Sequence, residues 1–319
     1  MKTKLPTVLL FTLPLAAFAA TLEQKAPPTP PPDAANPLLV WDVDPSLRDG
    51  MPRSFRTTSD PLKPKAGQSA PSAAGLADLH ASGSSEFTAA SLKLMLPKFH
   101  GPVTIFDLRQ EDHGFVNGEP ISWFATNNWA NVGKTHAAIV ADEKARLAAF
   151  TPGEKIALAD DKVKKGGADV TAPENVTVAQ VQTEAQLAAA DGVSYVRVTV
   201  SDHSRPTDAE VDRFVEGVRA MPADGWAHFH CRAGKGRTTT FLALYDMLRN
   251  SNRASLDDIV ARQSLLGGDY DLFKPDDTAD GKAGGFADRA AFVRAFYNYS
   301  RDNPGGQPKL WSEWLKAQP

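Results

Sequence analysis

The chain has 319 residues, of which 42% are hydrophobic and 23% are charged, and its formal net charge at pH 7 is −3. This composition is typical of a globular protein with one large or two small domains. The small negative charge excludes a general affinity for nucleic acid or for anionic membranes, so we expect neither as a partner. Any anion-binding site must be a local feature, and the oligomeric state stays open.

A targeting segment is predicted at the start of the chain. After a short basic stretch, residues 5–18 form an apolar run of the length found in signal peptides, and Ala17 and Ala19 supply the small side chains of a cleavage site. The alternative is an N-terminal membrane anchor. We expect residues 1–19 to be a signal peptide cleaved before Ala20, and the protein to be exported, periplasmic or secreted if the source is bacterial.

The next part of the chain opens the predicted globular body. Residues 20–50 are rich in proline, which predicts an extended linker. Residues 51–118 form the first part of the main domain, in which Arg56 is either a solvated surface charge or a ligand contact. The β-prone residues 103–108 predict a buried strand, and the polar residues 109–118 predict a turn-forming loop at its end.

Two stretches have no strong periodic pattern. Residues 61–83 are rich in Ala, Ser, Gly and Pro and predict a loop with at most one short helix. Residues 119–190 are mixed, with a predicted helix at 143–150 among turn signals and short β-prone pieces.

A second strand end carries an acidic residue. Residues 194–200 are rich in β-branched side chains and predict a strand, and residues 208–221 predict a helix whose N-cap is Thr207, with Glu210 completing a capping box. Asp202 lies between these elements. On a loop that can close, its carboxyl group could protonate a leaving oxygen, or it could simply cap the turn before the helix.

The strongest local pattern surrounds the only cysteine, Cys231. The aromatic residues 226–229 predict a buried strand, and residues 239–248 have the apolar spacing of an amphipathic helix. The tight loop between them directs backbone N–H groups and a helix N-terminus at one point, which favours an anion site.

The residue types in this loop indicate its chemistry. Cys231 supplies a nucleophilic thiolate, Gly234 and Gly236 allow the backbone to approach an oxyanion, and Arg237 offers a planar fork for two phosphoryl oxygens. The hydroxyl of Thr238 can donate to the sulfur. Together these groups predict a cradle for a phosphate monoester with a nucleophile at its floor.

Two other interpretations of this loop are weaker. A lone cysteine is often structural, but here a complete pattern lies between a strand and a helix. An ATP-binding Walker loop needs four residues between its glycines and then Gly-Lys-Ser/Thr. Only Lys235 separates Gly234 from Gly236, and Gly236 occupies the Ser/Thr position, so we reject that motif.

The segment from His230 to Thr238 matches every fixed position of the pattern His-Cys-x-x-Gly-x-x-Arg-Thr/Ser and resembles the phosphate loop of the protein tyrosine phosphatase superfamily. Together with residues 106–118 and the Asp202 loop, it resembles the bacterial protein-tyrosine-phosphatase-like phytases over nearly all of the mature chain. The resemblance implies an α/β fold with a central sheet flanked by helices and a small partial β-barrel subdomain. Residues 119–190 are the candidate for that subdomain, and residues 191–319 complete the phosphatase domain.

The resemblance also implies an activity. It is the stepwise hydrolysis of myo-inositol hexakisphosphate and lower inositol polyphosphates through a phosphocysteine intermediate, without a metal or other cofactor. Asp202 would be the general acid, and His230 would orient Cys231. Gln263 is a candidate for positioning the hydrolytic water, and Lys274 for reaching the pocket mouth. The other candidate substrate contacts are Arg232, Ala233, Gly234, Lys235, Gly236, His203, Arg205, Arg109 and Arg56.

Three alternatives remain open at this point. A protein tyrosine or dual-specificity phosphatase would use the same loop on phosphopeptides, and a phosphoinositide phosphatase would need access to a membrane surface. The third is an inactive phosphate-binding module, against which the joint presence of Cys231, Arg237 and Asp202 argues.

Beyond the loop, residues 286–299 and 311–315 predict two further helices.

Overall fold

The computed structural model describes residues 26–160, 173–275 and 285–318. The predicted signal peptide, residues 1–19, lies outside these ranges. Among the residues described, no helix combines the length and the apolar character that crossing a membrane would require.

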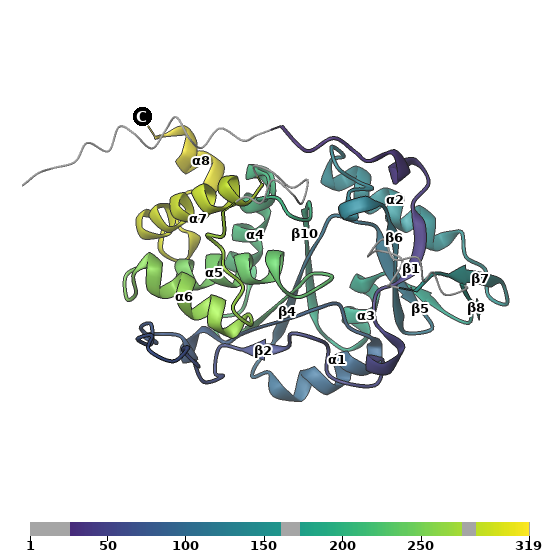
Figure 1. The fold of residues 1–319 in the computed structure, drawn as a ribbon, viewed down its shortest axis with the longest axis horizontal. Coiled ribbons are helices and arrows are strands. Elements are labelled where there is room, and N and C mark those ends of the chain that lie inside the picture. Colours follow the sequence, from purple (N-terminus) through teal and green to yellow (C-terminus); the bar gives the residue numbers. More distant parts are fainter. Residues whose placement is uncertain (1–25, 161–172, 276–284, 319) are drawn as a thin grey trace, which may run out of the picture.

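A five-stranded sheet forms the centre of the molecule, in the order β10-β4-β11-β3-β2 (Figure 1). The first four strands run parallel, and β2 is antiparallel to β3 at the edge. In sheet order the strands are Ser194–Val200, Val103–Arg109, Trp226–His230, Ala81–Ser84 and Arg56–Thr57. The carboxyl ends of parallel strands meet at one edge, where α/β proteins place their ligands.

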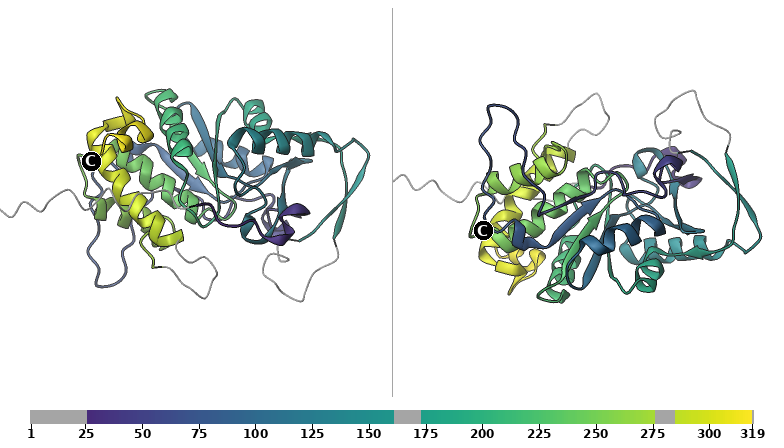
Figure 2. Two further views of the ribbon diagram at one scale, coloured as in Figure 1. Left: turned by 90° about the horizontal axis from the view of Figure 1, so that it is seen from above. Right: turned by 90° about the horizontal axis from the view of Figure 1, so that it is seen from below.

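Helices cover both faces of this sheet, as two further views also show (Figure 2). One face packs against α4, α5, α6, α7 and α8, which span Asp208–Ala220, Gly236–Asn250, Leu256–Leu266, Gly285–Asp302 and Trp311–Lys316. The other face packs against α1, Ala89–Met95, and α3, Glu184–Ala190. Because strands alternate their side chains, Ile105 enters the α1/α3 core and its neighbour Phe106 enters the α5 core. Each fully buried side chain of this kind contributes roughly 1.5–3 kcal/mol relative to exposure.

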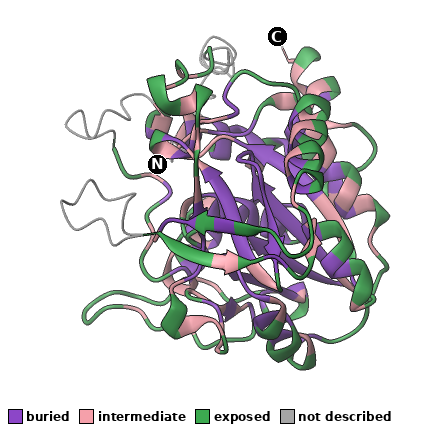
Figure 3. Cartoon of the chain, turned by 90° about the vertical axis from the view of Figure 1, so that its right-hand side faces the viewer, coloured by how far each residue is buried: buried purple, intermediate pink, exposed green. Residues whose placement is uncertain are grey.

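A second, antiparallel sheet has the order β1-β6-β5-β9. Its strands are Leu38–Trp41, Glu119–Phe124, His113–Val116 and Val181–Gln182. The helix α2, His136–Ala148, and the hairpin of β7, Lys155–Leu158, with β8, Glu174–Thr177, lie beside it. The strands of both sheets are largely buried, and the outer faces of the helices are exposed (Figure 3). Whether this region closes into a partial barrel stays a prediction.

Much of the predicted framework is confirmed. The strands expected at 103–108, 194–200 and 226–229 are β4, β10 and β11, and the helix expected at 208–221 is α4. The helix expected at 143–150 is the second half of the longer α2. The two C-terminal helices are present as α7 and α8.

Three loop predictions were wrong in part. Part of the expected linker forms β1, because Val40 and Trp41 bury their side chains beside the second sheet. The expected loop at 61–83 ends in β3, whose small residues leave room for α5: a Cβ on Gly83 would lie 2.7 Å from Cγ2 of Thr238. The expected loop at 109–118 contains β5, so a domain boundary at residue 118 would cut through the second sheet.

Two helix details also differ from expectation. The helix α5 is buried on nearly all sides rather than along one face, because α6 and α7 cover what would be its polar side. Thr207 caps α4 as expected, with its hydroxyl accepting from the N–H of Glu210. The reciprocal half of the capping box is replaced, because the Glu210 carboxylate accepts from the N–H of Thr199 instead.

Candidate active site

The loop from Cys231 to Arg237 joins the end of β11 to the start of α5. The thiol of Cys231 is 3% exposed and accepts a hydrogen bond from the hydroxyl of Thr238 at 3.2 Å, as the sequence predicted. Gly234 has φ 71°, and a Cβ on it would lie 2.3 Å from the backbone nitrogen of Ser85, so only glycine fits. The helix α5 therefore begins directly at this loop, with its positive end toward the thiol.

Arg237 is fixed by a carboxylate for which the sequence predicted no role. Glu111 accepts two parallel hydrogen bonds, at 2.7 Å from Nη1 and 2.9 Å from Nη2 of Arg237. Burial alone would raise the pKa of Glu111, but Arg237 and Arg109 hold it well below its usual range. The third nitrogen of Arg237, Nε, is buried without a hydrogen-bond partner. Arg237 is therefore oriented in advance, with one donor still available.

Asp202 lies on the loop after β10, next to Arg237. Its Oδ2 is 3.4 Å from Nη2 of Arg237 and accepts a hydrogen bond from Nδ2 of Asn128 at 2.7 Å. Burial alone would raise the pKa of this carboxyl, but Arg237, His203 and the Asn128 donor hold it below its usual value. The expected strand-end acid and the phosphate-loop arginine thus come together in the fold.

Arg56 was expected to contact substrate, and the structure gives it a different role. Its guanidinium is buried and donates to the carbonyl of Gly234 at 2.7 Å and to the hydroxyl of Thr239 at 3.1 Å. Burial lowers the pKa of Arg56 to about 10. Arg56 therefore stabilises the backbone of the phosphate loop through these two hydrogen bonds.

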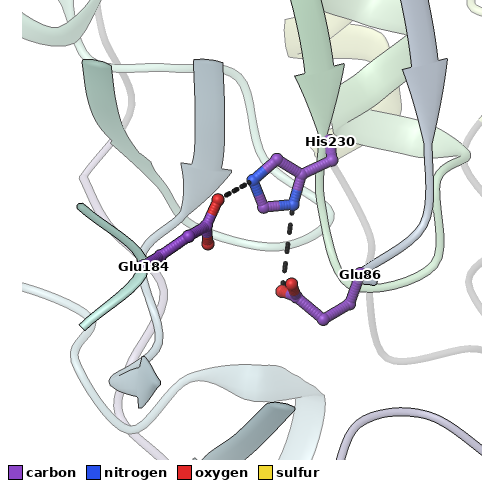
Figure 4. A group of neighbouring side chains, drawn as sticks. All are labelled: Glu86, Glu184 and His230. Carbon is purple, nitrogen blue, oxygen red and sulfur yellow. Dashed lines mark ion pairs between the residues drawn. The ribbon is translucent and has the colours of Figure 1, made fainter. Parts of the chain in front are cut away.

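His230 also differs from expectation. Consecutive residues of β11 face opposite sides of the sheet, so His230 points away from the face that carries Cys231. Its Nε2 lies 2.7 Å from Glu184 and its Nδ1 lies 3.8 Å from Glu86, without the alignment of hydrogen bonds (Figure 4). Burial alone would lower the pKa of His230, but these two carboxylates raise it to about 9. His230 anchors the end of β11 as a buried cation.

Two triads have ligand atoms close enough for a metal ion, Glu86/Glu184/His230 and Asp107/His113/Glu184. In the first, the two carboxylates face the two ring nitrogens of His230 and raise its pKa to about 9, so the imidazole pairs with them as a cation (Figure 4). In the second, burial opposes protonation of His113, but Asp107 and Glu143 raise its pKa well above the ordinary value. A protonated imidazole donates and does not ligate metals. We interpret both groups as ion pairs.

Three other predicted contacts lie inside the scaffold. Arg109 is fully buried and pairs with Asp42, Glu86 and Glu111. Arg205 pairs with Asp208 and Asp288, at the starts of α4 and α7. Gln263 is fully buried and donates to Asp246 between α6 and α5. Each prediction took a polar side chain to be solvent-facing when a buried partner holds it.

The remaining predicted contacts surround the loop. Ala233 and Lys235 are exposed on it, and Gly236 begins α5. Arg232 is half-buried and its Nε donates to Asp42 at 2.8 Å. His203 adopts φ 63° next to Asp202, with Nε2 at 3.8 Å from that carboxylate. Lys274 is exposed and stands over the ring of Phe286.

One basic residue near the loop was not predicted from the sequence. Arg289 of α7 is only 2% exposed, and its Nη1 lies 3.7 Å from where a Cβ on Gly236 would stand. Its guanidinium stacks on Tyr270 and Phe286 but forms no ion pair with a carboxylate in the described ranges. Its position in the sequence could have indicated a functional role, because a charged residue at Arg289 interrupts the apolar stripe of the predicted amphipathic helix.

The fold and this loop place the protein in the class of protein-tyrosine-phosphatase-like folds, and comparisons with known proteins give its family. The profile of the PTP-like phytase family, described as "Inositol hexakisphosphate", matches residues 106–249. A PTP-like phytase of Bdellovibrio bacteriovorus is 38% identical, with a TM-score of 0.72 over 92% of this chain and 98% of that one. The chain therefore belongs to the protein-tyrosine-phosphatase-like phytase family.

Two longer relatives share this fold or sequence. The PTP-like myo-inositol phosphatase of Mitsuokella multacida, solved with myo-inositol-(1,3,4,5)-tetrakisphosphate, is 36% identical with a TM-score of 0.78, over 88% of this chain and 49% of that one. The effector protein hopD2 of Pseudomonas syringae pathovar tomato is 30% identical over 282 residues, 87% of this chain and 59% of that protein. The chain thus spans about half of each of these relatives.

Proposed function

We propose that this protein is a cysteine-dependent phosphatase that hydrolyses myo-inositol hexakisphosphate and lower inositol polyphosphates. The observation that carries the proposal is the arrangement of Arg237. Glu111 fixes its guanidinium, Asp202 stands 3.4 Å from Nη2, and Nε is buried without a partner in the loop that holds Cys231. A phosphoryl oxygen satisfies that unpaired donor, as a buried donor requires.

The first step transfers the phosphoryl group to the enzyme. The Cys231 thiolate attacks phosphorus and forms an S–P bond while the ester P–O bond breaks. Asp202 gives its proton to the leaving alkoxide, which departs as the alcohol. Arg237 and the backbone N–H groups at the start of α5 stabilise the charge on the equatorial oxygens.

The second step releases phosphate. Asp202, now ionised, removes a proton from a water molecule that attacks the phosphocysteine. The S–P bond breaks, and Cys231 returns as the thiolate, to which the Thr238 hydroxyl donates. Apart from the substrate and water, this mechanism uses only residues of the chain, and phosphate is the group transferred to Cys231 and then to water.

Two observations support inositol polyphosphates as the substrate class. A relative that shares the fold was solved with an inositol tetrakisphosphate. In addition, Arg289 and Lys235 flank the phosphate loop without a carboxylate partner among the described residues. A substrate with phosphates on neighbouring carbons would give these cations partners, whereas a simple monoester would not.

The test compares phosphate release from inositol hexakisphosphate and from a phosphotyrosine peptide, each with and without a chelator. We expect a higher kcat/KM for the inositol substrate, unchanged by the chelator. A preference for the peptide would establish the protein tyrosine phosphatase alternative. Loss of activity in chelator that a metal restores would overturn the proposed mechanism.

We further propose that the protein is exported, with cleavage before Ala20. The apolar run at residues 5–18 followed by small residues supports this. N-terminal sequencing of the protein recovered from the periplasmic or culture fraction should begin at Ala20. A chain that retains its first 19 residues in the cell would contradict it.

A further inference from the structure

Two side chains from outside the phosphatase motifs contact the proposed acid, Asp202. Both lie on the segment that connects β6 of the second sheet to α2. Nδ2 of Asn128 donates to Oδ2 of Asp202 at 2.7 Å, and Nε1 of Trp129 donates to the backbone carbonyl of Asp202 at 2.9 Å. Asn128 is buried, and its own Oδ1 has no hydrogen-bond partner.

The backbone of this segment is strained where it reaches Asp202. Asn127 and Asn128 both have positive φ, at 60° and 59°. Consecutive left-handed residues other than glycine are uncommon, and each costs of order 1–3 kcal/mol. The second sheet and its neighbours hold the segment in place: Thr126 donates to Asp33 from both its N–H and its hydroxyl, and Asn131 donates to the carbonyl of Gln110.

We propose that Asn128 and Trp129 are positioning residues, which hold the Asp202 loop so that its carboxyl group faces the phosphate loop. The proposal rests on the phosphatase function proposed above. Asn128 fixes the carboxyl group itself, and Trp129 fixes the backbone that carries it. The second sheet thereby contributes to catalysis without touching the reacting atoms.

Both oxygens of the Asp202 carboxyl group are held in place. Oδ2 accepts from Nδ2 of Asn128 and lies 3.4 Å from Nη2 of Arg237, and Oδ1 accepts from the N–H of His203. Asn128 therefore orients the carboxyl group relative to Arg237.

The test exploits the leaving group. An inositol alkoxide needs a proton to depart, whereas p-nitrophenolate leaves readily without one. General acid catalysis typically contributes about 10²–10⁴-fold to the rate. Because Asn128→Ala misplaces the acid, its kcat on inositol hexakisphosphate should fall by at least about tenfold. The loss on p-nitrophenyl phosphate should be under about threefold. Trp129→Phe keeps an aromatic ring and removes the Nε1 donor, and it should show the same pattern more weakly.

The pH profile gives a second measurement. The charged or titratable groups facing Asp202 are Arg237 from α5, Glu111 behind it and His203 on the same loop. Removing the Asn128 donor destabilises the ionised carboxylate, so the pKa of Asp202 rises and the basic limb of kcat/KM moves to higher pH. A change that only loosened the fold would lower the whole profile without moving that limb.

A matched control and a double variant complete the design. Asn117 also has positive φ, at 55°, and its side chain bonds only backbone groups of residues 177–180, at the end of β8 and in the connection to β9. Asn117→Ala should therefore lower the midpoint of thermal unfolding without the leaving-group effect. In an Asp202→Asn background, Asn128→Ala should cost under about twofold, because it acts through the missing acid.

The outcomes separate this inference from the proposed function. Equal losses on both substrates, or an additive loss in the Asp202→Asn background, would overturn the positioning role. If the wild-type enzyme released no phosphate from inositol hexakisphosphate, the proposed function would fail before any variant was compared.

Discussion

Basic side chains gather in two regions beside the candidate active site, and their partners differ. The first region, the carboxylate cluster, lies at the junction of the two sheets and pairs every buried cation with acids. Its members are Asp42, Glu86, Asp107, Glu111, Glu143, Glu184, Arg109, Arg197, His113 and His230. The second region, the cationic edge, consists of Lys235, Lys274 and Arg289, which form no ion pair with any carboxylate in the described ranges.

This difference separates scaffold from site. A buried charge costs several kcal/mol unless it is paired, so the carboxylate cluster neutralises its arginines and holds them in place. Arg289 is equally buried, but its guanidinium packs on aromatic rings and forms no ion pair with a carboxylate in the described ranges. Substitutions in the carboxylate cluster should therefore affect mainly stability, and substitutions at the cationic edge should affect mainly activity.

The largest effect should come from the nucleophile between the two regions. Cys231→Ser should lower phosphate release from inositol hexakisphosphate by at least about a thousandfold, because a serine hydroxyl is not ionised near neutral pH. Substrate binding, measured by calorimetry, should persist, since the cationic edge is intact. Residual activity within about tenfold of wild type would overturn the phosphocysteine mechanism.

The carboxylate cluster should respond in stability. Arg109→Met leaves the carboxylate of Glu86 without its guanidinium and removes one of the two arginines paired with Asp42, and breaking a buried pair of this kind typically costs about 3–5 kcal/mol. The free energy of unfolding in urea should fall by that amount. The exposed Arg249, changed to Met in the same way, serves as control and should change it by less than about 0.5 kcal/mol. A loss below about 1 kcal/mol for Arg109→Met would mean that the cluster is not a scaffold.

The cationic edge should respond in activity instead. Arg289→Met removes a buried charge that no carboxylate neutralises, so stability should stay level or rise. The kcat/KM for inositol hexakisphosphate should fall by roughly tenfold or more, because a charge-assisted hydrogen bond is worth about 1.5–3 kcal/mol. Arg294→Met, on the exposed side of the same helix, should leave both quantities unchanged. A destabilised Arg289→Met with normal activity would assign Arg289 to the scaffold.

The contrast also explains what the sequence could and could not predict. The chemistry of the loop was readable because Cys231, Arg237 and Thr238 are local and their spacing is fixed. The central strands were readable because they are continuous apolar runs. The partners of Arg109 and Arg237 were not, since Asp42 and Glu111 reach them only through the packing of two sheets. The strand β3 carries small residues selected by contact with α5, so it has no β-propensity signal.

The smallest effects separate two neighbours that the sequence treated alike. Arg232 and Lys235 were both expected to contact substrate from the rim, but only Lys235 is exposed, whereas Arg232 pairs with Asp42 of the carboxylate cluster. Lys235→Ala should lower kcat/KM for inositol hexakisphosphate by roughly threefold to tenfold, about 0.7–1.4 kcal/mol. It should barely change activity on p-nitrophenyl phosphate, and added salt should shrink the difference because exposed charges are screened. Arg232→Ala should instead lower both activities equally, since the loop loses its attachment to Asp42. A substrate-selective loss in Arg232→Ala would place that side chain on the cationic edge, and the boundary between the two regions would move to include it.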